Sequence, residues 1–210
     1  MKKQLPYRTV TATYSNERLA YSLETYQDII TLDFDDMEVE KIPGYRRLAN
    51  DCPDTLGNFI SPREHGLKIF VYLTGEEPEA LRAELNALGN IDLPTLETYH
   101  HRMFALAADK YQKLLNTKVD TSGSDLSRGV FVSHDPDAFL SLERLENVKP
   151  LTVTLTLPTE EECKTPPHHG SRSRRPDTQL FRQPSRLRLR SASAQCLPIH
   201  LENGSGRRGF

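Results

Sequence analysis

The chain has 210 residues, of which 37% are hydrophobic, and this is enough for one domain of ordinary size with its own core. The formal net charge of -2 gives no overall basic character of the kind that indicates a nucleic-acid-binding protein. Three scattered cysteines (Cys52, Cys163 and Cys196) form no C-x-x-C pair and no even disulfide framework, so we expect a reducing, cytoplasmic environment and no zinc site. No apolar run approaches the ~20 residues of a membrane span, and no apolar segment typical of a signal peptide follows the first residues.

Alternating strand-like and helix-like segments run through the first two thirds of the chain. Periodicity and turn signals predict strands over residues 8–14, 29–34, 58–61, 67–73 and 130–133, and helices over 43–50, 77–88 and 96–115. Residues 16–26 are ambiguous between a loop and a short helix. Because the two kinds of segment interleave, we expect an α+β fold with a mostly antiparallel or mixed sheet and helices packed on it.

The composition changes abruptly near residue 165. From Thr165 onward the chain contains nine Arg, no Lys and two acidic residues, which gives this part a formal charge of +7 and the remainder -9. Apolar periodicity is lost there, and Ser and Pro are frequent. We therefore expect one domain over residues 8–147 and a basic, Arg/Ser/Pro-rich tail over 150–210 that is disordered. The tail is either an arm that holds phosphates or an out-of-frame segment with no evolved structure.

The first chemical signal is the stretch Ile29-Ile30-Thr31-Leu32-Asp33-Phe34-Asp35-Asp36. Alternate side chains of a strand point the same way, so Asp33 and Asp35 share one face. Two carboxylates held this close repel each other unless a cation lies between them, and their oxygens suit Mg²⁺ or Mn²⁺. The plain structural alternative is a strand that ends in an acidic turn.

The second signal links the strands at 58–61 and 67–73. It reads Ser61-Pro62-Arg63-Glu64-His65-Gly66-Leu67-Lys68 and combines a hydroxyl, backbone N–H groups and cations at the rim of a sheet. Such a link can bind phosphate oxygens. A solvated β-turn is the alternative, although Lys68 is unusual as the start of an otherwise apolar strand.

The third signal is the loop from Lys118 to Ser133. Asp120 or Asp125 could join the first two acids, and Arg128 could bind phosphate in a bidentate manner. The alternative is an Asx-type turn in which Arg128 pairs with Asp125.

Taken together, these three segments resemble the N-terminal domain of VirE-type proteins of bacterial mobile elements, which belongs with the primase-polymerase-like proteins of the archaeo-eukaryotic primase superfamily. The resemblance covers roughly residues 8–145. It is carried by the ordered motifs Leu32-Asp33-Phe34-Asp35, then Ser61-Pro62 with Gly66-Leu67-Lys68, then Val119-Asp120 with Asp125, Ser127-Arg128 and Phe131-Val132-Ser133.

The resemblance implies a metal-dependent DNA primase or polymerase, that is, a nucleotidyltransferase, acting in the DNA replication of a mobile element. It implies that Asp33, Asp35 and Asp120 are catalytic and bind Mg²⁺ or Mn²⁺ in a two-metal arrangement, with Asp125 as a further metal ligand or a rival to Asp120. It also implies a nucleoside triphosphate bound by Ser61, His65, Lys68 and Arg128. Many superfamily members carry histidine where Lys68 stands.

The expected partners are nucleoside triphosphates and a single-stranded nucleic acid template. A separate helicase or ATPase is a further candidate partner, because no G-x-x-x-x-G-K-[ST] motif occurs in this chain. No membrane partner is expected. One alternative is a catalytically inactive or truncated remnant that binds nucleic acid or protein. Another is a phosphohydrolase of the aspartyl-phosphate type, since an apolar strand followed by D-x-D also opens that family.

Overall fold

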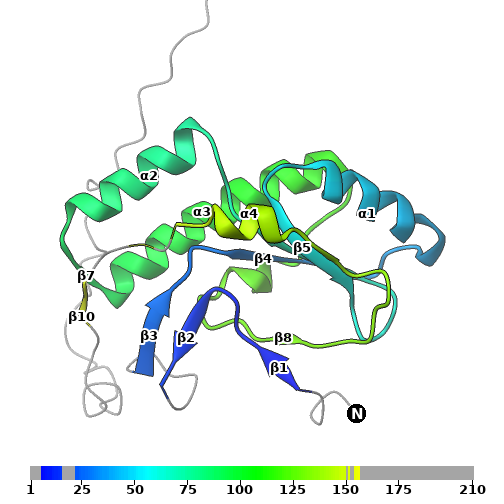
Figure 1. Cartoon of the computed structure of the whole chain (residues 1–210), viewed down its shortest axis with the longest axis horizontal. Coiled ribbons are helices and arrows are strands. Elements are labelled where there is room, and N and C mark those ends of the chain that lie inside the picture. The colour runs from blue at the N-terminus through cyan, green and yellow to red at the C-terminus, as the bar shows by residue number, and fades with distance from the viewer. Residues whose placement is uncertain (1–5, 16–21, 150, 152–153, 157–210) are drawn as a thin grey trace, which may run out of the picture. The chain divides into compact units, whose positions relative to one another are not determined.

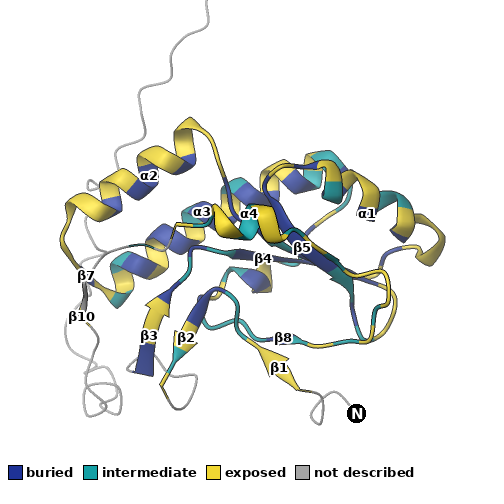
Figure 2. Ribbon diagram, in the orientation of Figure 1, coloured by how far each residue is buried: buried dark blue, intermediate teal, exposed yellow. Residues whose placement is uncertain are grey.

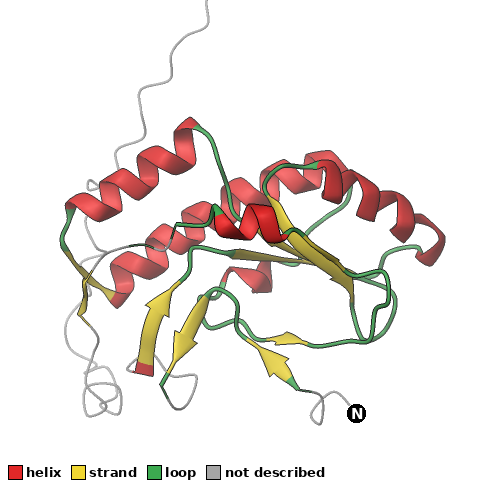
Figure 3. Cartoon of the chain, in the orientation of Figure 1, coloured by secondary structure: helices red, strands yellow, loops and turns green. Residues whose placement is uncertain are grey.

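The computed structural model describes residues 6–15, 22–149, 151 and 154–156, all within a unit that extends from Met1 to Pro166 (Figure 1). The strands are β1 (Tyr7–Arg8), β2 (Ala12–Tyr14), β3 (Leu23–Tyr26), β4 (Ile30–Phe34), β5 (Thr55–Ile60), β6 (Leu67–Val71), β7 (Asn90–Asp92), β8 (Val130–Phe131), β9 (Phe139–Leu140) and β10 (Thr154–Thr156). The helices are α1 (Ile42–Asp51), α2 (Glu76–Ala87), α3 (Leu93–Leu115) and α4 (Leu142–Glu146), with short 3₁₀ helices at Val39–Lys41 and Thr121–Ser124. The fold is therefore α+β, as the sequence predicts (Figure 3).

The main sheet has the strand order β4-β6-β5-β9, and every pairing in it is antiparallel. Two antiparallel ribbons, β1-β8 and β2-β3, and one parallel pair, β10-β7, complete the described strands. Most of the expected tail, from residue 157 onward, lies outside the described residues, and so does the disorder expected for it.

One face of the main sheet is the apolar face, and α3 packs against it. On β4 and β6, Leu32 lies opposite Ile69 and Phe34 lies opposite Leu67, and all four side chains are fully buried. The α3 helix begins at Leu93 and is capped by Asp92, whose carboxylate accepts a hydrogen bond from the Thr95 N–H at 3.0 Å. Its buried stripe includes Leu96, Tyr99, Met103, Ala107 and Tyr111, close to the 3.6-residue period of a helix.

The opposite face of the sheet carries the polar and aromatic side chains. Because directly opposed residues of antiparallel strands share a face, Thr31 and Asp33 of β4 lie on the same side as Lys68 and Phe70 of β6. Phe59 of β5 lies opposite Lys68 and joins them. All five residues of β4 are buried, including the polar ones, which shows that the chain also covers this side of β4 (Figure 2).

The main differences from the sequence-based expectations concern short strands. The strand expected over 8–14 is divided into β1 and β2, and the ambiguous stretch 16–26 ends in β3. The segment 130–133 is not a strand of the main sheet, because β8 pairs with β1 instead. Among the described residues, no helix combines the length and the apolar character needed to cross a membrane.

Candidate functional site

The carboxylates of Asp33, Asp35 and Asp120 come together at the end of β4. One oxygen of each lies within 4.8 Å of the others. Asp33 is buried in the strand, while Asp35 is exposed and follows the last strand residue by one position. Asp120 is held beside them by its backbone, since its N–H donates a hydrogen bond of 2.8 Å to the Asp33 carbonyl. A main-chain contact thus joins two segments that are far apart in the sequence.

The two oxygens of Asp33 have different surroundings. Oδ2 accepts a hydrogen bond from the Lys68 ammonium group and lies 3.8 Å from Nη2 of Arg128. Oδ1 is buried and has no hydrogen-bond partner. Burying a carboxylate oxygen without a hydrogen-bond partner costs free energy. This atom is therefore a candidate ligand for a cation.

Arg128 lies between two of the carboxylates. Its Nη2 is 3.6 Å from Oδ2 of Asp120, in addition to its contact with Asp33. Two cations, Lys68 and Arg128, therefore accompany the three acids. Such a mixture of charges can bind a divalent metal and a phosphate group at one place.

Asp120 is kept ionised by its own turn. Its carboxylate accepts hydrogen bonds from the Ser122 hydroxyl at 2.6 Å and from the Ser122 N–H at 2.9 Å. These bonds, followed by the charges of Arg128 and Lys68, hold the pKa of Asp120 below its usual value. The carboxylate is consequently in the form that binds metal.

The link between β5 and β6 lies directly against Asp35. Ser61 donates its N–H to the Gly66 carbonyl at 2.8 Å, which closes the turn. A Cβ atom on Gly66 would lie 3.0 Å from Oγ of Ser61 and 3.1 Å from Oδ1 of Asp35, so only glycine lets these groups approach so closely. His65 lies exposed in the same turn, and its carbonyl accepts the Met37 N–H at 2.8 Å.

Asp125 is the expected metal ligand that the structure does not bring into the group. Its exposed carboxylate accepts hydrogen bonds from the N–H and hydroxyl of Ser127, at 2.8 and 2.9 Å. This is an Asx-type turn. The nearest acids described for the Arg128 guanidinium are Asp33 and Asp120, so the turn of the structural alternative forms without a side-chain ion pair, and the Arg128 N–H donates to the Asp125 carbonyl at 3.0 Å.

The donor set fits a hard divalent cation. Mg²⁺ binds carboxylate oxygens at about 2.1 Å, so ligands on one ion lie roughly 3–4 Å apart, and small rotations of these side chains would bring them to that spacing. The unpartnered Oδ1 of Asp33 is available while Oδ2 remains on Lys68. Asp33, Asp35 and Asp120 would hold the ion.

The sequence motifs give no indication of two aromatic residues that lie beside this group. Phe59 and Phe70 lie on the same sheet face as Asp33 and Lys68. The signal was the alternation Lys68-x-Phe70, which puts a cation and an aromatic ring on one face of a strand.

These observations define an α+β domain with three carboxylates and two cations gathered at the rim of an antiparallel sheet. Residues 1–140 match the family described as the BT4734-like, N-terminal domain, and the chain belongs to this family. The expected assignment to the VirE N-terminal family is corrected by this match. No curated protein and no solved structure matches the chain.

Proposed function

We propose that this domain binds a nucleoside triphosphate together with a divalent metal and uses them for nucleotidyl transfer, in the manner of a primase-polymerase that synthesises a nucleic acid strand. The observation that carries the proposal is the environment of the two carboxylate oxygens of Asp33. One of its oxygens is held by Lys68, the other is buried without a partner, and the carboxylate as a whole lies beside two further carboxylates. This arrangement is typical of a metal site that also neutralises phosphate.

Each residue has a distinct role in this proposal. Asp33, Asp35 and Asp120 hold Mg²⁺ or Mn²⁺, which neutralises the charge that develops on the transferred phosphoryl group. Arg128, whose side chain is 35% exposed, can turn from the carboxylates toward phosphate oxygens. Ser61 supplies a hydroxyl at the turn beside Asp35.

Lys68 has a positioning role. Its side chain is 10% exposed and its ammonium group is bound to Asp33, so it fixes the carboxylate and lowers the local negative charge. A lysine acts as a compact point charge and does not grip phosphate in a fork as arginine does. We therefore assign the direct phosphate contact to Arg128 and the orientation of Asp33 to Lys68.

The test uses the full chain and two neighbouring substitutions. Asp33→Asn removes a ligand from the carboxylate group, whereas Asp36→Asn changes an exposed acid outside it. Asp36 has φ of 54°, a conformation that asparagine tolerates, so this control should fold normally. Mn²⁺ binding is followed by electron paramagnetic resonance, and nucleotide incorporation on a single-stranded template is followed by gel electrophoresis.

The proposal expects wild type and Asp36→Asn to bind Mn²⁺ and to extend or start strands, and Asp33→Asn to lose both. Equal Mn²⁺ binding in all three proteins would contradict the metal site. Metal binding without incorporation would leave a binding module with no strand synthesis. Phosphate release from a generic phosphomonoester, lost in Asp33→Asn, would instead indicate a phosphohydrolase.

A further inference from the structure

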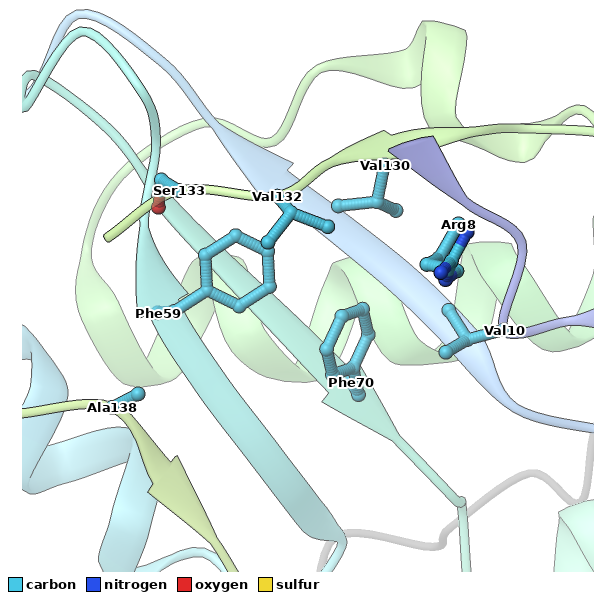
Figure 4. A pocket seen from close by; sticks show the side chains of 8 residues that line it. All are labelled: Arg8, Val10, Phe59, Phe70, Val130, Val132, Ser133 and Ala138. Carbon is cyan, nitrogen blue, oxygen red and sulfur yellow. The ribbon is translucent and has the colours of Figure 1, made fainter. Parts of the chain in front are cut away.

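The face of the main sheet that carries Asp33 also carries an apolar pocket of about 310 Å³. Its walls come from three parts of the chain: Phe59 and Phe70 on the sheet, Arg8 at the end of β1 with Val10 after it, and Val130 at the start of β8 with Val132 after it (Figure 4). The volume is at the lower end of the range for pockets that bind small molecules. The carboxylate site makes no use of these residues.

The strand register connects this pocket to the carboxylates. Asp33, Lys68 and Phe59 lie opposite one another on the three adjacent strands β4, β6 and β5. Neighbouring strands are about 4.8 Å apart, so Phe59 lies roughly 10 Å from Asp33 across the sheet. Phe70 follows Lys68 by two positions and so extends the same face. A single extended ligand can therefore reach both places.

We propose that the pocket holds the base of the nucleoside triphosphate whose phosphates lie at Asp33, Asp120 and Arg128. This inference rests on the proposed function and adds the part of the substrate that the charged site cannot recognise. The sugar then lies above Lys68, between the two subsites. Arg128 and Val130 are two residues apart, so the segment leading into β8 contributes to both ends of the ligand.

The lining favours a flat aromatic ring over an aliphatic chain. The rings of Phe59 and Phe70 have centroids 5.7 Å apart and planes inclined at 53°, and both side chains are only half-buried. Half-exposed aromatic rings on an open sheet are surfaces on which bases stack. Figure 4 shows the Arg8 side chain at the end of the pocket near Phe70 and Val10, where a guanidinium group can also lie against a π system.

The same lining predicts little discrimination between bases. Apart from Arg8, Ser133 is the polar residue that lines the pocket. A base would meet few groups that read its hydrogen-bonding edge, and stacking tolerates every base because each has a π face. A template strand is the better candidate for base selection.

The first experiment separates the base from the phosphates. Binding of ATP and of inorganic triphosphate is measured by calorimetry with the full chain in Mn²⁺. Phe59→Leu and Phe70→Leu keep an apolar side chain but remove the aromatic ring, and Tyr7→Leu makes the matched change on an exposed aromatic of β1 outside the lining. We expect at least about fivefold weaker ATP binding in the first two variants only, with triphosphate binding unchanged.

The second experiment uses the absence of tryptophan from this chain. Phe59→Trp introduces a single tryptophan whose fluorescence reports on the pocket. Stacking of a base should quench this fluorescence when ATP, GTP, CTP or UTP is added, with affinities within a few-fold of one another, whereas inorganic triphosphate should leave it unchanged.

The outcomes distinguish the two proposals. If ATP and inorganic triphosphate bind equally well and the phenylalanine variants match wild type, the base pocket is wrong while the phosphate site stands. If neither compound binds, and Asp33→Asn changes nothing, the proposed function fails as well. If inorganic triphosphate, which has no base, quenches the fluorescence of Phe59→Trp, the proposal of a base pocket is also overturned.

Discussion

Asp33 and Lys68 lie directly opposite each other on β4 and β6, and the lysine ammonium group donates a hydrogen bond to Oδ2 of the aspartate. Their side chains are 7% and 10% exposed, so this is a buried ion pair on the polar and aromatic face of the sheet. Such a pair is costly to bury and gains little net stability. Its retention in the sheet is better explained by function than by stability.

Lys68→Met should destabilise the metal-free protein and make its stability depend on metal. Removing the ammonium group leaves the buried Asp33 carboxylate without its hydrogen-bonded cation, with Arg128 3.8 Å away as the remaining positive charge, at a cost of about 3–5 kcal/mol. Mg²⁺ or Mn²⁺ should restore part of this loss, because the metal replaces the missing charge. Thermal unfolding with and without Mn²⁺ measures the effect.

The control Lys113→Met removes an exposed i,i+4 pair with Asp109 and should change stability by less than about 1 kcal/mol. An unchanged metal response in Lys68→Met would contradict the prediction.

Gly66→Ala should disturb the turn that holds Ser61 against Asp35. The added methyl group would lie 2.6 Å from the Phe34 carbonyl oxygen, and a backbone atom cannot move aside easily. We expect a loss of about 1–3 kcal/mol in the free energy of unfolding, measured in urea, together with weaker Mn²⁺ binding. Gly44→Ala in α1 is the matched control, because a Cβ there meets no atom within 4 Å and alanine favours a helix. That variant should be equally or more stable, and a similar loss in both would refute the steric argument.

Arg46→Ala should release the loop that follows β8. The Arg46 guanidinium donates to Oδ2 of Asp135 at 2.7 Å and also to the Asp137 carbonyl, while the same Asp135 oxygen accepts the Ile60 N–H at 2.8 Å. Burial acts to raise the pKa of Asp135, but the hydrogen bonds from Arg46 and Ile60 outweigh it and lower the pKa. Loss of the buried partner should cost about 3–5 kcal/mol. The substitution Arg47→Ala, on the exposed next residue, should cost less than about 0.5 kcal/mol, and comparable unfolding midpoints for the two variants would contradict this account.

His100 should make stability fall on acidification. It is buried on α3, with Nδ1 3.0 Å from the Tyr26 hydroxyl, and burial followed by the nearby His101 lowers its pKa to about 4. Because the unfolded pKa is about 6.5, the unfolded chain binds the proton first, and stability is lost as pH falls from about 6.5 to about 4. The loss is on the order of 3 kcal/mol.

Urea unfolding at several pH values checks this prediction against His100→Gln. The variant lacks the titrating group, so its stability should change less than that of wild type across this window. The exposed neighbour in His101→Gln removes only the smaller cause of the lowered pKa of His100, so most of the wild-type pH dependence should remain. Buried Asp28, whose pKa burial raises, titrates in all three proteins and cancels from the comparison. Parallel pH profiles for wild type and His100→Gln would show that the imidazole is not the cause.

The sequence could predict those features that depend on local pattern. The apolar stripe of α3, the strand ending at Phe34 and the turn between β5 and β6 follow from periodicity and from turn residues, and the structure confirms these elements. The carboxylates of Asp33 and Asp35 could be placed on one face for the same reason.

Features that depend on distant partners could not be predicted. Arg82 on α2 reaches the fully buried Asp28 at 2.6 Å, although neither residue carries a local signal of this pairing. The choice between Asp120 and Asp125 likewise depends on one backbone hydrogen bond, from Asp120 to Asp33, that spacing does not reveal. The pairing of β8 with β1 joins segments more than 120 residues apart, so the isolated pattern of residues 130–133 resembled an ordinary core strand.

The main-chain bond between the Asp120 N–H and the Asp33 carbonyl has a consequence for protein engineering. If Asp120 is the third ligand of the proposed metal site, its position is fixed by the backbone, so its side chain can be exchanged without moving the loop. Asp120→His would replace a hard oxygen donor with an imidazole and shift the preference of the centre from alkaline-earth ions toward Zn²⁺, Co²⁺ or Ni²⁺. Under the proposed function, the metal selectivity of the domain could thus be reprogrammed at a single position.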